Sequence, residues 1–204
     1  LKKGSKILDV GSNDGLLLDF LKQRGAITFG VDPAEKVSKI SSNKGHAIFC
    51  EYLNQNLVKK IQASKTSPFD VITANNVFSH SDDLQSALEC IANLMTIEGF
   101  YIFEVSYLLD TLKNRVIDYI YHEHLSYHSV KSLVPFLKSK KLYIYDIIKI
   151  PTKGGSIRVV CGKNEKKENI TLLNSMISFE ESEKIFQEKT YTGIKNELLK
   201  SKNI

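Results

Sequence analysis

Residues 7–15 read Ile-Leu-Asp-Val-Gly-Ser-Asn-Asp-Gly, and the mostly apolar residues 16–21 follow at once. The run predicts a short buried strand, a tight turn between Gly11 and Gly15, and an amphipathic helix. Such a turn exposes backbone N–H groups beside a helix N-terminus, so a ligand can approach the peptide groups closely. The stretch therefore predicts a nucleotide-like ligand at the end of the first strand.

The same strand–helix alternation continues along the chain. After the first strand at 7–10, further strands are predicted at 28–32, 47–50, 69–74 and 99–105, with helices at 15–24, 34–44, 57–63 and 82–95. Beyond them the pattern predicts helices at 108–119 and 130–140 around a polar, aromatic loop at 121–129, then β-rich runs at 142–150 and 156–162. Residues 151–155, Pro-Thr-Lys-Gly-Gly, have turn chemistry suited to an antiparallel pair.

These elements together predict an α/β fold, a doubly wound parallel sheet closed by a terminal antiparallel hairpin. That arrangement is typical of class I methyltransferases, which have a Rossmann-like sheet and use S-adenosylmethionine. From Lys163 the composition turns polar, and residues 171–202 are expected to be helical.

The glycine turn favours S-adenosylmethionine over a dinucleotide. Gly11 has no second glycine two positions later, as the dinucleotide pattern requires, and Asp14 would repel a diphosphate. A carboxylate beside the turn suits a cationic sulfonium and an ammonium group. Asp32 follows the turn by about 20 residues, the separation at which a nucleotide-binding unit places a carboxylate on a ribose.

Polar residues at the ends of successive strands complete the predicted cofactor site. Glu51 is expected to receive the adenine amino group, with Tyr52 beside the ring. The alternative for each residue alone is ordinary loop chemistry, with Asp32 as a helix cap before Pro33 and the asparagines as turn formers. The predicted cofactor-binding residues are Gly11, Ser12, Asn13, Asp14, Gly15, Asp32, Pro33, Glu51, Tyr52, Asn75, Asn76 and Phe78.

A second unusual stretch spans residues 119–129, where three of the five histidines, a glutamate and three tyrosines gather. Metal binding is one interpretation, but adjacent residues point apart and no further Cys or Asp partner stands in the run. We therefore predict no metal site. Packing of amphipathic side chains in a loop is the other alternative.

The run at 121–127, Tyr-His-Glu-His-Leu-Ser-Tyr, together with the turn at 11–15 and Lys-Gly-Gly-Ser-Ile-Arg at 153–158, resembles the sugar C-methyltransferases that act on nucleotide-linked deoxy keto sugars. The resemblance covers most of residues 7–162. It implies that His124 is the general base and that Tyr121 and Glu123 line the sugar site. It also implies substrate contacts from His122, His128, Gly155, Ser156 and Arg158.

The chemistry agrees with those roles. Methylation at carbon needs removal of a proton beside a carbonyl, which an imidazole with an ordinary pKa of about 6.5 can accept. A tyrosine hydroxyl can donate a hydrogen bond to the developing enolate oxygen. The alternatives are a methyltransferase for another small molecule or RNA, and a catalytically silent binding domain.

The bulk properties agree with a globular enzyme domain. With 204 residues, 42% of them hydrophobic, the chain can bury one core, and no apolar run approaches the roughly 20 residues that span a bilayer. The first residues show no signal peptide, so a cytoplasmic location is expected. The net charge of +5 comes from scattered lysines, which argues against nucleic acid. Cys50, Cys90 and Cys161 predict neither disulfides nor a metal site.

The domain organisation is expected to be incomplete relative to the family. Its members typically carry a cysteine-rich zinc domain before the cofactor domain and an α/β domain behind it. We expect a methyltransferase domain that binds S-adenosylmethionine at 1–163, and a helical tail at 164–204 that begins a truncated C-terminal domain. Such a fragment would bind the cofactor but act slowly, if at all, on a nucleotide sugar.

Overall fold

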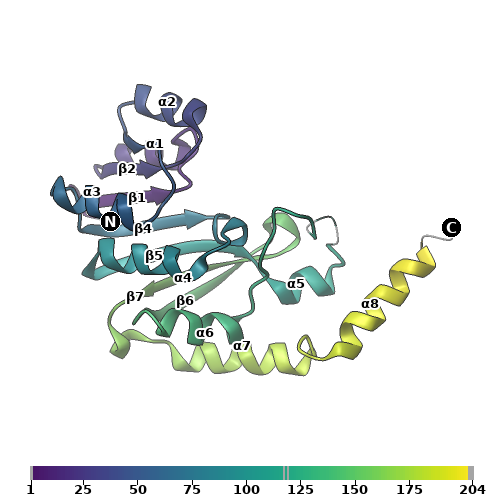
Figure 1. The fold of residues 1–204 in the computed structure, drawn as a ribbon. Helices are drawn as coiled ribbons and strands as arrows, with labels where there is room; N and C mark the ends of the chain where they lie inside the picture. Colours follow the sequence, from purple (N-terminus) through teal and green to yellow (C-terminus); the bar gives the residue numbers. More distant parts are fainter. Residues whose placement is uncertain (1, 117, 119, 202–204) are drawn as a thin grey trace.

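The computed structural model of the chain describes residues 2–116, 118 and 120–201. Its centre is one seven-stranded sheet with the order β3-β2-β1-β4-β5-β7-β6 (Figure 1). Neighbours among the first five strands run parallel, and β7 runs antiparallel to both β5 and β6. The predicted doubly wound sheet with a terminal antiparallel hairpin is therefore confirmed. The strands are β1 (Lys6–Val10), β2 (Ile27–Val31), β3 (Ala47–Phe49), β4 (Phe69–Asn75), β5 (Met95–Ser106), β6 (Tyr143–Ile150) and β7 (Ser156–Gly162).

Helices connect the parallel strands and continue beyond the sheet. They are α1 (Leu16–Gln23), α2 (Glu35–Asn43), α3 (Gln55–Ala63), α4 (Leu84–Leu94), α5 (Leu108–Lys113), α6 (Val130–Lys138), α7 (Ile170–Ser182) and α8 (Glu188–Ser201). Short 3-10 turns lie at η1 (Phe78–His80), η3 (Thr152–Gly154) and η4 (Glu165–Lys167). Helices α6 and α7 lie side by side, whereas α8 projects away from the sheet (Figure 1).

An aromatic stack forms the middle of the core and shapes the chain after β4. Tyr101 and Phe103 of β5 stack at 4.9 Å between ring centroids, and Phe78 stacks on Phe103 at 5.3 Å. All three are buried. Burial of Phe78 holds the chain after β4 against the sheet. Because β1 runs parallel to both β2 and β4, the carboxyl ends of these three strands lie at the same edge.

Two predicted helices differ from the structure. The helix predicted at 108–119 ends at Lys113, because Arg115 takes a left-handed backbone conformation with φ of 54°; residues 117 and 119 lie outside the described residues. The helix predicted at 171–202 is two helices, and Lys184 between them has φ of 56°. Residue 202 lies outside the described part of the chain.

Helix length and composition bear on membrane insertion. Within the described ranges, every helix is too short or too polar to cross a bilayer.

Candidate functional site

A cavity of about 670 Å³ opens at the carboxyl ends of β1, β2, β3 and β4. Its size is in the range of small-molecule and cofactor sites. We call it the main cavity, and it is lined by Val10, Gly11, Val31, Pro33, Glu51, Tyr52, Leu53, Asn54, Val77, Phe78, His80, Ser81, Asp82, Asp83, Ser86, Ala87, Ile91 and Leu125.

The glycine turn forms one rim of the main cavity. Gly11 has φ of 71°, and a Cβ there would lie 2.5 Å from Val77 Cγ2, so the turn packs against the chain after β4. The carboxylate of Asp32 links the turn to the start of α2. Its Oδ2 accepts a hydrogen bond from Asn13 N, and its Oδ1 accepts one from Ala34 N, both at 2.9 Å. Each carboxylate oxygen keeps a second lone pair for a ligand hydroxyl.

Two buried polar side chains lie behind this turn. Ser12 Oγ is buried and has no hydrogen-bond partner in the described chain. Asp9 is 4% exposed and accepts a 2.6 Å bond from Thr73 Oγ1. Burial raises the pKa of Asp9 from 3.8 to about 6, against the smaller effect of the Thr73 bond.

The predicted cofactor residues fall into two groups. Those that line the main cavity are Gly11, Pro33, Glu51, Tyr52 and Phe78. In the described chain, the following lie outside its lining: Ser12, Asn13, Asp14, Gly15, Asp32, Asn75 and Asn76. Asn76 has φ of 57° and turns the chain at the end of β4, so Val77 and Phe78 form the wall instead. Ser12, Asn13 and Asp32 support the turn.

Glu51 and Tyr52 occupy the open end of the main cavity. Glu51 pairs with Lys60 at 2.7 Å, and Tyr52 is 74% exposed. The Glu51 carboxylate therefore has a cation beside it, and an incoming amino group would share its oxygens with Lys60.

The predicted general base lies beside the same cavity. Tyr121 Oη is 3.4 Å from His124 Nε2, and the ring of His80 meets that of His124 edge to face at 4.9 Å. The next residue, Leu125, lines the cavity and donates its N–H to Ser79 O at 2.7 Å. This contact brings the segment 121–125 to the chain that follows β4.

His80 was not among the predicted residues. It lies in η1 and lines the main cavity in contact with His124. The only sequence signal was its position a few residues after a predicted strand, and the dense run at 119–129 carried most of the histidines. Its contact with His124 spans 44 positions, and no local pattern predicts it.

His122 and Glu123 face solvent. Their side chains are 88% and 60% exposed, and His122 Nε2 lies 4.0 Å from Glu123 Oε1. In the described chain neither lines the main cavity. The structure therefore places the predicted catalytic Glu123 next to, but not in, the wall that Leu125 completes.

His128 is buried instead of facing a ligand. It is 6% exposed, its Nε2 lies 3.1 Å from Ser126 Oγ, and its carbonyl accepts the N–H of Leu108 at 2.9 Å. Its ring lies 6.5 Å from that of Phe78. Burial lowers the pKa of His128 from 6.5 to about 4, so the ring is neutral near pH 7. In this structure His128 anchors the end of the segment 121–128.

The hairpin residues predicted to contact substrate lie farther along the same sheet edge. Arg158 Nη2 donates to Glu104 Oε2 at 3.0 Å, and Thr152 Oγ1 donates to Glu104 Oε1 at 3.2 Å. Glu104 pairs in register with Asn75 on one side and Arg158 on the other. Ser156 is fully buried. In the described chain these hairpin residues do not line the main cavity.

Gly155 lines a separate cavity of about 390 Å³ with Asp110 and Lys149. Its φ is 125°, and a Cβ there would lie 2.3 Å from Asp110 Cβ. The hairpin turn is thus pressed against α5, the helix that leads toward Tyr121.

Among the described residues, no group of three or more His, Cys, Asp or Glu side chains is arranged to hold a metal ion. Cys90 and Cys161 are buried, Cys50 is exposed, and all three are free thiols.

Comparison with known proteins gives the family context for this geometry. Residues 1–139 match the family model described as "Methyltransferase domain". The chain is 30% identical over 159 residues to the C-methyltransferase NovU of Streptomyces niveus, covering 78% of this chain and 38% of NovU. It is 30% identical over 102 residues to the mitochondrial ubiquinone biosynthesis O-methyltransferase of Homo sapiens, covering 47% of this chain and 27% of that protein.

Solved structures share the fold at low sequence identity. Magnesium protoporphyrin IX methyltransferase from Synechocystis PCC 6803, with bound S-adenosylmethionine, matches with a TM-score of 0.60 at 16% identity, over 79% of this chain and 71% of that one. A methyltransferase from Clostridium acetobutylicum matches with a TM-score of 0.59 at 15% identity, over 77% and 83%. The chain spans well under half the length of the curated relatives named above.

Proposed function

We propose that this chain, which belongs to the methyltransferase-domain family and has the fold of class I S-adenosylmethionine-dependent methyltransferases, methylates a small molecule. The proposed acceptor atom is a carbon next to the carbonyl of a nucleotide-linked keto sugar. The main cavity is the proposed donor site. The segment 121–125 is the proposed acceptor side.

One observation carries this proposal. Leu125 lines the main cavity and is hydrogen-bonded to Ser79 O at 2.7 Å, and it directly follows His124. The His124 imidazole, which has the chemistry of a base, is therefore next to the wall residue Leu125 and against His80, which also lines this cavity of cofactor size. Proximity of this kind is what a group transfer between two bound molecules requires.

Residues that line the main cavity, together with Asp32 and the rest of the turn beside it, fit the methyl donor. The backbone of the glycine turn and Asp32 would hold its amino-acid and ribose parts, and Pro33, Glu51 and Tyr52 its adenine. When bound, S-adenosylmethionine supplies an electrophilic methyl group on a sulfonium. The buried, unpartnered Ser12 Oγ offers a further polar atom beside the turn.

The acceptor chemistry follows from the Tyr121–His124 pair. In the proposed reaction His124 takes the proton from the carbon beside the carbonyl, and the Tyr121 hydroxyl donates to the enolate oxygen that develops. The 3.4 Å between Tyr121 Oη and His124 Nε2 lets both groups reach one small acceptor. His80, against the His124 ring, would keep the imidazole facing the cavity.

Methyl transfer to oxygen is the second candidate. The identity to the human O-methyltransferase equals that to NovU, though it covers less of the chain. A histidine base can also deprotonate a hydroxyl. The two reactions differ in the atom that carries the new methyl group, which labelling distinguishes.

The experiment has a binding arm and a product arm on the 204-residue chain. Calorimetry with S-adenosylmethionine and S-adenosylhomocysteine should give saturable binding at one site. Incubation with donor labelled with 13C in the methyl group and a nucleoside-diphosphate-linked keto sugar should then give a product whose methyl 13C shift is that of a carbon-bound methyl. Long incubations are used so that slow turnover can also be detected.

The arms fail separately. Absence of binding heat at millimolar donor would overturn the donor site, and with it the enzyme proposal. An oxygen-bound methyl in the product would replace C-methylation by O-methylation. Donor binding with no product, and with no exchange of the sugar's α-hydrogen with deuterated solvent, would keep the donor site but reject the keto sugar as the acceptor.

A further inference from the structure

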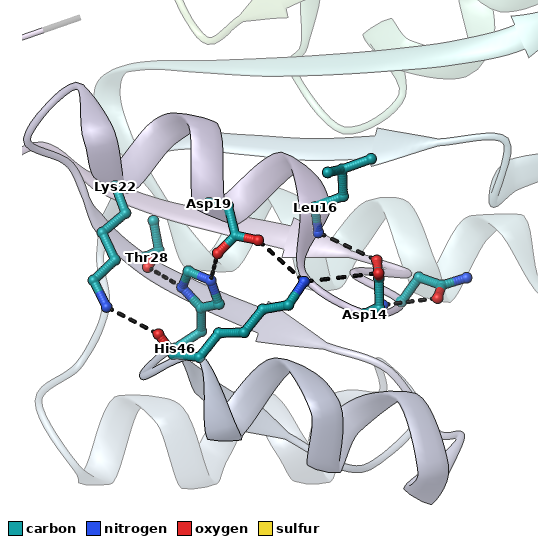
Figure 2. A network of polar contacts seen from close by, with 8 residues as sticks. Asp14, Leu16, Asp19, Lys22, Thr28 and His46 are labelled. Atoms are coloured by element: carbon teal, nitrogen blue, oxygen red, sulfur yellow. Dashed lines mark hydrogen bonds and ion pairs between the residues drawn. The ribbon is translucent and has the colours of Figure 1, made fainter.

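A charged network lies on the outer side of the glycine turn (Figure 2). His46 Nε2 is 2.9 Å from Asp19 Oδ1, and His46 Nδ1 is 2.8 Å from Thr28 Oγ1. Lys44 Nζ is 3.0 Å from Asp19 Oδ2 and 3.7 Å from Asp14 Oδ2. The network therefore connects β2, α1 and the residues before β3 to the turn itself.

His46 is the buried centre of this network. Its side chain is fully buried, and its two ring nitrogens face groups from two different elements. A carboxylate only accepts hydrogen bonds, so Nε2 carries the hydrogen that Asp19 accepts, and in the neutral ring Nδ1 accepts from the Thr28 hydroxyl. The bond from His46, more than that from Lys44, lowers the pKa of Asp19 below its usual value. The ring is therefore fixed in position between Asp19 and Thr28.

The glycine turn rests directly on this ring. Gly15 has φ of 81°, and a Cβ there would lie 3.0 Å from His46 Cδ2 and 2.3 Å from Ser41 Oγ. Ser41 is fully buried on α2. The end of the turn is thus held between α2 and the imidazole, and the place of Gly15 depends on both.

Asp14 points into the network. Asp14 Oδ2 and Asp19 Oδ2 both lie within 4 Å of the Lys44 ammonium, and Asp14 Oδ1 also accepts the N–H of Leu16 at 3.3 Å (Figure 2). In the described chain Asp14 does not line the main cavity. Its charge is therefore balanced by Lys44, which weakens the expectation that Asp14 itself faces the cationic cofactor.

We propose that Lys44 and His46 are positioning residues for the methyl donor, holding the turn from Gly11 to Gly15 in the shape that binds the amino-acid end of the cofactor. The inference rests on the proposed donor site. The alternative is that Asp14 recognises the sulfonium directly, and it predicts the opposite change in S-adenosylmethionine affinity when Lys44 is removed. If Asp14 attracted the sulfonium directly, removal of Lys44 would free its charge and strengthen binding of the cation.

The experiment compares ligand fragments by calorimetry at one salt concentration. Lys44→Met should lower the affinities for S-adenosylmethionine and S-adenosylhomocysteine alike, by on the order of fivefold. Adenosine affinity should change less, because adenosine lacks the amino-acid part and its adenine would lie beside Pro33 and Glu51 at the other end of the cavity. Lys44→Arg should restore wild-type affinities. Lys39→Met removes an equal charge from an exposed position on α2, the helix that ends just before Lys44, and should leave all three affinities unchanged.

A buried variant adds a second measure. His46→Gln keeps a polar side chain but cannot span Asp19 and Thr28 as the imidazole does. It should therefore weaken binding of S-adenosylhomocysteine more than Lys44→Met does, with a smaller effect on adenosine. The ratio of the affinities for S-adenosylhomocysteine and adenosine, measured on protein shown to be folded by circular dichroism, separates an effect on the turn from a general loss of structure.

Three results would overturn the inference. Tighter binding of S-adenosylmethionine alone in Lys44→Met would assign recognition to Asp14. An equal loss of adenosine affinity would mean that the variants disturb the whole cavity and not the turn. Unchanged affinities in both variants, with normal binding by the wild type, would show that the network does not act on the turn. If the wild type binds neither cofactor form, the proposed donor site fails, and the inference with it.

Discussion

The donor side and the acceptor side of the sheet edge are built from contacts of very different range. Around the glycine turn, two of the bonds that fix the site join residues close in sequence: Asn13 to Asp32 across 19 positions, and His46 to Thr28 across 18. On the acceptor side, Arg158 reaches Glu104 across 54 positions and Glu180 reaches Tyr107 across 73. The donor side is thus fixed mainly by local bonds, with the Asp9–Thr73 bond across 64 positions as a longer one, whereas the acceptor side is assembled by the whole fold.

This difference predicts that the two sides can be damaged independently. The largest expected effect is on turnover. His124→Asn keeps a side chain of similar polarity but removes the base, so kcat should fall about 10²- to 10⁴-fold while the affinity for S-adenosylhomocysteine stays within twofold or so. Product formation with labelled donor and calorimetry provide the two measurements.

Two further variants locate the effect within the acceptor side. Tyr121→Phe should lower kcat less than His124→Asn, since it removes a hydrogen bond to the enolate and not the base. His80→Asn should lower kcat without a change in donor affinity, because it removes the ring that packs on His124. A large loss of donor affinity in any of the three would contradict the separation of the two sides.

The same contrast explains what the sequence could predict. The turn from Gly11 to Gly15 and the strand before it follow from glycine spacing and apolar runs within about 20 residues, so the fold was predicted correctly from local patterns. Asn75 and Asn76 were expected in the donor site from strand position alone. The structure instead turns the chain at Asn76, with φ of 57°, and lines the cavity with Val77 and Phe78.

The acceptor side depends on packing that no local pattern encodes. His80 meets His124 only because burial of Phe78 and the Leu125–Ser79 bond bring two distant segments together. The break between α7 and α8 at Lys184 has no glycine or proline to mark it. Sequence reasoning could therefore identify the reactive residue types at 121–124 but not the partner that completes them.

The next largest effect concerns stability. Glu180 of α7 is fully buried, and it accepts bonds from Val130 N at 2.6 Å, Tyr107 Oη at 2.9 Å and Lys131 N at 3.0 Å. Glu180→Ala leaves these donors without their acceptor at the start of α6, so the free energy of unfolding should fall by about 3 kcal/mol. Urea denaturation measures it.

The neighbouring residue is the matched control. Glu181 pairs with the same Lys131 through its ammonium at 2.6 Å, but both side chains are about half exposed. Glu181→Ala should cost less than about 1 kcal/mol. Equal losses in the two variants would mean that α7 does not anchor the acceptor side through Glu180.

The pH dependence of stability should contain two opposing contributions, one from each side. His128 has a folded pKa of about 4 against 6.5 unfolded, so its contribution is complete above pH 6.5 and is lost as the pH falls toward 4. Asp9 has a folded pKa of about 6 against 3.8 unfolded, so its contribution is complete below pH 3.8 and is lost as the pH rises through 6. Each amounts to about 3 kcal/mol at most.

Because the two windows overlap, these contributions largely cancel between pH 4 and 6 in the wild type. Asp9→Asn removes one of them while keeping an acceptor for Thr73 Oγ1. The variant should therefore lose stability relative to wild type on acidification from pH 6.5 to 4, by up to about 3 kcal/mol. Urea midpoints at several pH values test this, and a constant difference between the two proteins across that range would refute it.

The smallest effect separates the hairpin from the donor side. Gly155 has φ of 125° and no room for a Cβ beside Asp110, so Gly155→Ala should cost about 2 kcal/mol of stability and shift α5, which leads toward Tyr121. Turnover should fall severalfold, while donor affinity is kept. The control is Gly193→Ala in α8, where a Cβ meets nothing within 4 Å and alanine should stabilise the helix by about 0.5–1 kcal/mol. If Gly155→Ala weakened the donor instead, the hairpin and the glycine turn would have to be mechanically coupled across β4 and β5, and the two sides would no longer be independent units.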